Sequence, residues 1–219
     1  MIKNISTVIW DWNGTLLNDV DVCIESMNRL LEKRHLPILD RTRYLEVFTF
    51  PVIDYYKILG FDFTKETFDM PALEFIEAYN MNFSKCTLQD GAGRALNYFS
   101  EINITQYVLS AMEQDELLRT IGHFSIQHFF REMIGISDHF ASGKIEKAKE
   151  FIQKESIDLK NTLFIGDSQH DHEVAVQLGC NCVLITNGHQ PSQKLEKTGR
   201  PLFKNLDELI NHFEYSKTE

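Results

Sequence analysis

Residues 7–17 read TVIWDWNGTLL. The first four residues are apolar or β-branched, which is typical of a buried strand in a parallel sheet. The run ends on Asp11, and in open α/β sheets ligands bind at the carboxyl ends of such strands. Gly14 permits a sharp turn close to a ligand, and Thr15 adds a hydroxyl group. The stretch therefore predicts either a reacting carboxylate at Asp11 or an ordinary turn in which Asp11 caps a helix.

The composition argues against several classes of function. The chain has 219 residues, of which 43% are hydrophobic, and a formal net charge of −10. This acidic balance disfavours binding to nucleic acid or to anionic membranes, because both require basic patches. Apolar runs stay shorter than the roughly 20 residues of a membrane span. With no secretory signal pattern and no zinc-type cysteine spacing, we expect a cytoplasmic protein with reduced cysteines.

The order of the remaining elements predicts an α/β fold. Residues 18–86 have helical apolar spacing and lack a convincing strand, so they are expected to form an inserted all-helical domain. From residue 87 onward, apolar runs alternate with helical segments, which predicts parallel βαβ units with right-handed crossovers. We therefore expect a Rossmann-like, doubly wound parallel sheet formed by residues 1–17 and 87–219.

Four further expectations concern where individual elements begin and end. A helix is expected to begin near Asp19, and a further helical stretch is expected to begin at Thr64. The strand that starts at Thr105 is expected to end at Ser110. Residues 187–199 are rich in polar residues and glycine, which predicts a long loop.

Polar side chains follow four of the expected strands where each strand ends. Asp11 follows the first strand, Ser110 ends the second, a lysine-rich helix follows the third, and Asp167 follows the fourth. A doubly wound sheet brings these ends to one edge. Carboxylates, a hydroxyl and an ammonium group together suit a hard cation such as Mg²⁺ and a phosphoryl group. The ammonium group is expected to be that of Lys144, because Gly143 lets the backbone bring it close, and Lys147 is the alternative.

These residues resemble the four motifs of the haloacid dehalogenase superfamily. Residues 11–16 are similar to its first motif, Asp-x-Asp-x-Thr, and Ser110 and the lysine are similar to its second and third. Gly166-Asp167-Ser168-x-x-Asp171 is similar to the acidic fourth motif. Residues 18–86 fall where the family carries a helical cap of the C1 type. The overall pattern resembles phosphoglycolate phosphatase-like members, which implies a Mg²⁺-dependent phosphohydrolase acting on a small phosphorylated substrate.

The resemblance also implies a role for each site residue. Asp11 would be the nucleophile that forms an aspartyl-phosphate. The ligands of Mg²⁺ would be Asp11, Asp167 and the main-chain carbonyl of Asn13. The groups on the substrate phosphate would be those of Thr15, Ser110, Ala111 and Lys144. The residues that support the metal and the lysine would be Asp171, Ser168 and His170.

One position departs from the family pattern. Asn13 stands where the family's phosphatases carry an Asp that protonates the leaving oxygen and then activates water. A carboxamide does neither at neutral pH, and general acid–base catalysis contributes about 10²–10⁴-fold to rate. Either the substrate has a good leaving group, or a histidine replaces the acid. The candidate histidines are His170, His172 and His189.

Two other functions stay open on the sequence alone. The family's phosphonate hydrolases also lack the second Asp, but they use a cap lysine, for which Lys33, Lys57 and Lys65 are candidates. A binding protein could instead have kept the pocket without turnover. Substrate choice is expected to lie in the cap, where Arg43 or Lys57 would meet a substrate carboxylate. Whether the chain is a monomer or a dimer stays open.

Overall fold

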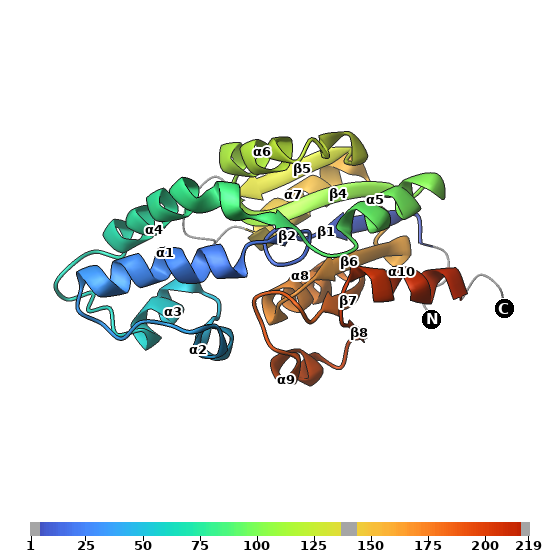
Figure 1. Cartoon of the computed structure of the whole chain (residues 1–219). Helices are drawn as coiled ribbons and strands as arrows, with labels where there is room; N and C mark the ends of the chain where they lie inside the picture. The colour runs from blue at the N-terminus through green and yellow to red at the C-terminus, as the bar shows by residue number, and fades with distance from the viewer. Residues whose placement is uncertain (1–4, 137–143, 216–219) are drawn as a thin grey trace.

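A six-stranded sheet forms the centre of the computed structural model, which describes residues 5–136 and 144–215. The six strands of this sheet are parallel, in the order β5-β4-β1-β6-β7-β8 (Figure 1). They are β1 (Thr7–Trp10), β4 (Thr105–Glu113), β5 (Glu132–Ile136), β6 (Thr162–Gly166), β7 (Asn181–Ile185) and β8 (Leu202–Phe203). The predicted doubly wound α/β fold is confirmed.

Strand β1 lies inside the sheet because its residues are apolar on both faces. It pairs with β4 on one side and with β6 on the other. Val8 and Trp10 belong to one hydrophobic core, whereas Ile9 belongs to the core on the opposite face. Burial on both faces explains why the strand reads as a continuous apolar run rather than as an alternating one.

Helices cover both faces of the sheet. The first core contains residues of α5 (Ala92–Glu101), α6 (Gln114–His123) and α10 (Leu206–Tyr215). The second core contains residues of α7 (Lys144–Glu155) and α8 (Gln169–Leu178). Short 3₁₀ turns, η2 (Gln127–Phe129) and η3 (Leu159–Asn161), precede strands β5 and β6. None of the described helices combines the length and apolarity needed to cross a membrane.

Between β1 and α5 the chain forms a group of helices at one end of the sheet (Figure 1). They are α1 (Val20–Lys33), α2 (Arg41–Val47), α3 (Val52–Ile58), α4 (Asp69–Asn82) and the 3₁₀ turn η1 (Phe83–Lys85). Where the chain enters and leaves this group, β2 (Leu17–Asn18) pairs antiparallel with β3 (Thr87–Leu88). We propose that this pair marks the boundary between a core of residues 1–17 and 87–219 and a helical cap of residues 18–86.

Three local elements differ from the sequence expectations. Strand β4 continues past Ser110 to Glu113, which pairs with Ile136 after a shift in register. Residues near Thr64 form turns, and α4 begins only at Asp69. Pro71 does not interrupt that helix, because it lies in the first turn, where the backbone N–H groups have no helical partner. The expected loop 187–199 contains α9 (Ser192–Leu195) and the 3₁₀ turn η4 (Glu196–Thr198).

Candidate active site

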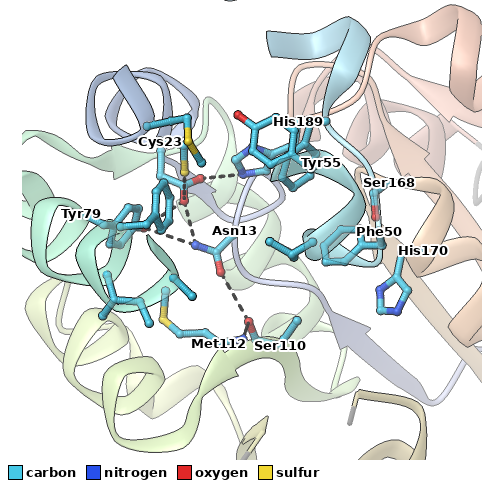
Figure 2. A pocket seen from close by; sticks show the side chains of 18 of the residues that line it. Asn13, Cys23, Phe50, Tyr55, Tyr79, Ser110, Met112, Ser168, His170 and His189 are labelled. Atoms are coloured by element: carbon cyan, nitrogen blue, oxygen red, sulfur yellow. Dashed lines mark hydrogen bonds and ion pairs between the residues drawn. The ribbon is translucent and has the colours of Figure 1, made fainter. Parts of the chain in front are cut away.

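A cavity of about 220 Å³ lies between the carboxyl ends of the strands and the cap (Figure 2). The core contributes Asp11, Ser110, Lys144 and Asp167 to its wall, among other residues. The cap contributes mostly aromatic side chains. The strand ends therefore meet at one place, as expected of a doubly wound sheet.

The floor of this cavity is a buried cluster of three carboxylates and one ammonium group. Lys144 forms ion pairs with Asp11 and with Asp171, the latter at 2.7 Å between Nζ and Oδ1. Carboxylate oxygens of Asp11, Asp167 and Asp171 lie within 4.8 Å of one another. The structure thus brings Lys144 to the strand edge. Lys147 instead pairs with Glu150 on the surface, with its side chain 41% exposed.

The cluster carries more negative than positive charge, and this shifts its pKa values. Burial and the neighbouring carboxylates raise the pKa of Asp11, although Lys144 opposes the shift. Burial raises the pKa of Asp167 to about 6, against the effect of nearby His189. Burial lowers the pKa of Lys144, but the two carboxylates outweigh it, so the net direction is upward. A divalent cation beside Asp11 and Asp167 would offset the excess charge.

Asp171 is already fully engaged within the protein. Its Oδ2 accepts hydrogen bonds from the Ser168 hydroxyl at 2.7 Å and from the Ser168 backbone N–H at 3.1 Å. Together these groups form the capping box at the N-terminus of α8. Its Oδ1 accepts a hydrogen bond from Lys144. Asp171 therefore orients the lysine and also caps the N-terminus of α8.

Two glycines make room for the carboxylate of Asp167. Gly14 has φ +77°, and a Cβ there would lie 2.4 Å from Asp167 Oδ2. A Cβ on Gly188 would lie 2.2 Å from the same oxygen. Thr15, expected on the substrate, is fully buried behind this carboxylate. Its hydroxyl lies 3.1 Å from Asp167 Oδ1 and 3.3 Å from Asp11 Oδ2.

The orientation of the Asn13 amide follows from its partners. Nδ2 donates to Asp19 Oδ2 at 2.7 Å and lies 3.3 Å from the Tyr79 hydroxyl. A carboxylate only accepts hydrogen bonds, so the NH₂ group must face Asp19. The carbonyl Oδ1 consequently faces Ser110, whose hydroxyl lies 3.5 Å away (Figure 2). The position that carries an acid in related phosphatases thus presents an acceptor to the cavity.

Asp19 and His189 form a second buried charge pair. Asp19, 1% exposed, accepts hydrogen bonds from His189 Nε2 at 3.1 Å, Tyr79 at 2.9 Å and the Gly14 backbone at 3.0 Å. The other ring nitrogen of His189 lies 2.8 Å from the Tyr44 hydroxyl. Burial opposes both charges, but their mutual attraction lowers the pKa of Asp19 and raises that of His189 to about 9. Both side chains are therefore charged at neutral pH.

Sequence reasoning missed this pair. Asp19 was expected only as the first residue of a helix, and it does precede α1, but its side chain forms no capping hydrogen bond. His189 was considered only as a replacement acid. The two residues are 170 positions apart, and no spacing in the sequence links them. The pairing arises only where the loop after β7 meets the start of the cap.

The other candidate histidines have different surroundings. His170 lines the cavity and stacks on Phe50, with ring centroids 4.5 Å apart. Burial and the charge of Lys144 lower its pKa to about 4, so it is neutral at pH 7 and poorly suited to donate a proton. His172 lies outside the cavity wall, where Arg200 Nε donates to its Nδ1 at 3.2 Å. Ala111 and Ser168 both line the cavity.

The candidate cap cations do not reach the cavity. Lys33, Lys57 and Lys65 are exposed and pair with Glu74, Asp54 and Asp62, respectively. Arg43 is also exposed and lies 3.4 Å from Glu46. Among the described residues, Lys144 is the only lysine or arginine in the cavity wall.

Asp19→Asn is expected to destabilise the protein by about 1.5–3 kcal/mol, the usual worth of hydrogen bonds to a charged group. The substitution keeps the shape but removes the charge that faces His189. Urea denaturation measures the change. The matched control is Asp21→Asn in the first turn of α1, whose exposed pair with Arg41 is expected to contribute within about 0.5 kcal/mol. Equal losses in the two variants would contradict a stabilising role for the buried pair.

Comparison with known proteins identifies the family. The profile described as haloacid dehalogenase-like hydrolase matches residues 8–185, which is most of the chain. The chain therefore belongs to this hydrolase family. No curated protein sequence matches it.

Several solved structures share the fold at low sequence identity. A hydrolase of the haloacid dehalogenase-like family from Streptococcus pneumoniae is 18% identical, with TM-score 0.80 over 96% of this chain and 99% of that one. A predicted phosphoglycolate phosphatase from Haemophilus somnus is 17% identical, with TM-score 0.77 over 97% and 100%. Protein Tyrosine Kinase A from Mycobacterium tuberculosis is 19% identical, with TM-score 0.80 over 96% and 98%. At these identities the likeness shows the fold and does not choose among activities.

Proposed function

We propose that this protein is a Mg²⁺-dependent phosphohydrolase that transfers a phosphoryl group from a small substrate to Asp11 and then to water. The observation that carries the proposal is the position of Asp11. It follows the central strand, lines the cavity and is held by Lys144 beside Asp167. An oriented, buried carboxylate at that place suits nucleophilic catalysis.

The donor set at this place fits magnesium. Mg²⁺ prefers oxygen ligands and few carboxylates, and the cluster is short of positive charge. The side chains of Asp11 and Asp167, with the main-chain carbonyl of Asn13, would hold the ion. When bound, it would supply charge neutralisation for the phosphoryl oxygens.

The protein's own groups divide the remaining work. One oxygen of Asp11 attacks phosphorus, the bond to the leaving oxygen breaks, and the electron pair goes to that oxygen. Lys144 and the Ser110 hydroxyl hold phosphoryl oxygens, and Ala111 lines the same cavity. Water then attacks the phosphorus of the aspartyl-phosphate, the bond from phosphorus to the Asp11 oxygen breaks, and its electron pair returns to Asp11 as a carboxylate. The hydrogens of the water leave with the released phosphate. Asn13 Oδ1 accepts a hydrogen bond from that water but takes no proton from it.

The alternative functions receive less support from the geometry. A phosphonate hydrolase that forms a Schiff base needs a cap lysine in the cavity, and Lys33, Lys57 and Lys65 point to carboxylates on the surface. A binding protein without turnover is favoured only by Asn13, which cannot act as a general acid, and the retained Asp11 and Asp167 speak against it.

The proposal is tested by measuring phosphate release from acetyl phosphate and a panel of phosphomonoesters, with Mg²⁺ and with EDTA. We expect release that needs Mg²⁺ and disappears in Asp11→Asn. If no compound is hydrolysed while phosphate with Mg²⁺ still raises the melting temperature, the protein binds phosphate without turnover and the proposal is wrong.

Swapping the two residues, so that Asp stands at position 13 and Asn at position 19, is expected to create a general acid. Asn13 Nδ2 lies 2.7 Å from Asp19 Oδ2. Asn13→Asp alone would therefore place a second carboxylate within hydrogen-bond distance of Asp19. Two carboxylates so close repel each other, so this variant is expected to lose stability. In Asn13→Asp/Asp19→Asn the hydrogen bond re-forms with donor and acceptor exchanged. We expect the double variant to be more stable than the two single changes predict together.

The exchange also changes the rate on poor leaving groups. We expect the double variant to hydrolyse an alkyl phosphate about 10²-fold faster than the wild type, the lower end of the range for general acid catalysis. A double-mutant cycle of unfolding free energies measures the effect on stability, and the rate on benzyl phosphate measures the effect on catalysis. Additive stabilities with an unchanged rate would show that Asn13 does not limit proton transfer.

A further inference from the structure

We propose that the substrate is an aryl phosphate, the phosphate monoester of a phenol, whose ring lies in the aromatic part of the cavity. This inference rests on the proposed phosphohydrolase function and names its substrate class. Two independent observations carry it: the chemistry of the cavity wall and the missing acid at position 13.

The wall that faces the phosphoryl site is aromatic. Phe48, Phe50, Tyr55, Phe75 and Tyr79 all line it, and they come from helices α3 and α4 and from the loop between α2 and α3. The ring of Phe48 packs against those of Phe50 and Tyr55 at 5.5 and 5.4 Å between centroids. Flat apolar side chains in this arrangement favour an aromatic guest by area burial and by edge-to-face contacts.

The charges in the wall disfavour a substrate that carries a second anionic group. The cationic side chains there, among the described residues, are Lys144 and the protonated His189. Lys144 is engaged by Asp11 and Asp171, and His189 is engaged by Asp19. Glu113 and Glu116 also line the cavity. A carboxylate on the substrate would find no free cation and would face like charges. A phosphorylated acid, which the family resemblance suggested, is therefore a poor chemical match.

The missing acid points to the same class. Asn13 cannot protonate the leaving oxygen. The protonated His189 also lines the cavity, but its two ring nitrogens are held by Asp19 at 3.1 Å and by the Tyr44 hydroxyl at 2.8 Å, so it has no free N–H to give. The substrate must therefore release an oxygen that departs as an anion. Phenols have a pKa of about 10, as the tyrosine side chain does, whereas an alkyl alcohol is closer to water, at about 15.7. A phenolate therefore leaves without the proton that an alkoxide requires.

The size of the cavity is consistent with one ring. A buried apolar cavity of about 150 Å³ is large enough to hold benzene. The cavity here measures about 220 Å³. It therefore has room for a single ring and for the phosphoryl group at its floor.

Four substrates separate the two observations. Phenyl phosphate has both the ring and the good leaving group. Benzyl phosphate keeps a ring but leaves as an alkoxide, acetyl phosphate keeps the good leaving group without a ring, and 2-phosphoglycolate has neither. Steady-state kinetics with Mg²⁺ give kcat and KM for each substrate, and Asp11→Asn is the background control.

We expect phenyl phosphate to have the highest kcat/KM. Benzyl phosphate is expected to have a KM within about threefold of it and a kcat lower by about 10²-fold or more, because only proton transfer is lacking. Acetyl phosphate is expected to turn over, with a KM higher by about 10–100-fold, the value of burying one ring. Phe75→Ala is expected to raise KM for phenyl phosphate by a larger factor than for acetyl phosphate.

Two kinds of result would overturn the inference while the proposed function stands. One is a kcat/KM for 2-phosphoglycolate above that of phenyl phosphate. The other is equal KM values for phenyl and acetyl phosphate, which would show that the aromatic wall does not bind the substrate. If none of the four is hydrolysed, acetyl phosphate included, the proposed phosphohydrolase function fails and this inference fails with it.

Discussion

Asp11→Asn is expected to lower phosphate release by about 10⁴–10⁶-fold and at the same time to raise the stability of the fold. The rate falls because an amide cannot form the aspartyl-phosphate, and loss of a nucleophile commonly has an effect of this order. The stability rises because one of three crowded carboxylates loses its charge, while Lys144 keeps its pair with Asp171 at 2.7 Å. Phosphate release and thermal unfolding without Mg²⁺ measure the two effects.

The second half of this prediction excludes misfolding as the cause of lost activity. Each 1 kcal/mol gained raises the melting temperature of a domain of this size by about 2–4 °C. Asp19→Asn is the matched control, because it is the same chemical change in the same cavity wall, but it removes the partner of His189. The two variants should move the melting temperature in opposite directions. A rate for Asp11→Asn above about a tenth of the wild-type rate would exclude Asp11 as the nucleophile.

Local patterns were enough to predict the core of the fold. TVIW at residues 7–10 is apolar throughout, and that property alone places it inside a parallel sheet with Asp11 at the functional edge. The end of β6 beside Asp167 and the start of the helix at Lys144 were also predictable from local patterns. Where two lysines stand three residues apart, as Lys144 and Lys147 do, they share a helix face. The sequence favours Lys144 only through the neighbouring Gly143, and the packing of α7 brings Lys144 to Asp11 and leaves Lys147 beside Glu150.

Features that depend on the contact between distant segments were not predictable. The partner of Asp19 lies in the loop after β7, and the space for Asp167 depends on Gly14 and Gly188 from two different loops. The aromatic residues of the cap read equally well as an ordinary hydrophobic core. The way in which the cap packs on the strand ends decides whether a ring such as Phe75 fills a core or lines a cavity. No local sequence pattern predicts that packing.

Lys144→Met is expected to cost about 3–5 kcal/mol of stability, because it leaves buried carboxylates without their cation. Its Nζ is the partner of both Asp11 and Asp171, and all three side chains are buried. Phosphate release is expected to fall as well, by about 10²–10³-fold, the usual loss when one group that stabilises developing charge is removed. Urea denaturation and phosphate release measure these losses.

Magnesium distinguishes this explanation from a simple packing defect. With Lys144 gone, a divalent cation becomes the remaining positive charge near Asp11 and Asp167, so Mg²⁺ should stabilise Lys144→Met by more than it stabilises the wild type. The matched control is Lys147→Met, three residues along α7, whose half-exposed side chain pairs with Glu150 at 3.2 Å. It should change stability by no more than about 0.5 kcal/mol. Equal losses of stability in the two variants would contradict the explanation by unpaired buried carboxylates. So would a loss in Lys144→Met that Mg²⁺ leaves unchanged, because only an unpaired buried charge makes the loss of stability depend on a cation.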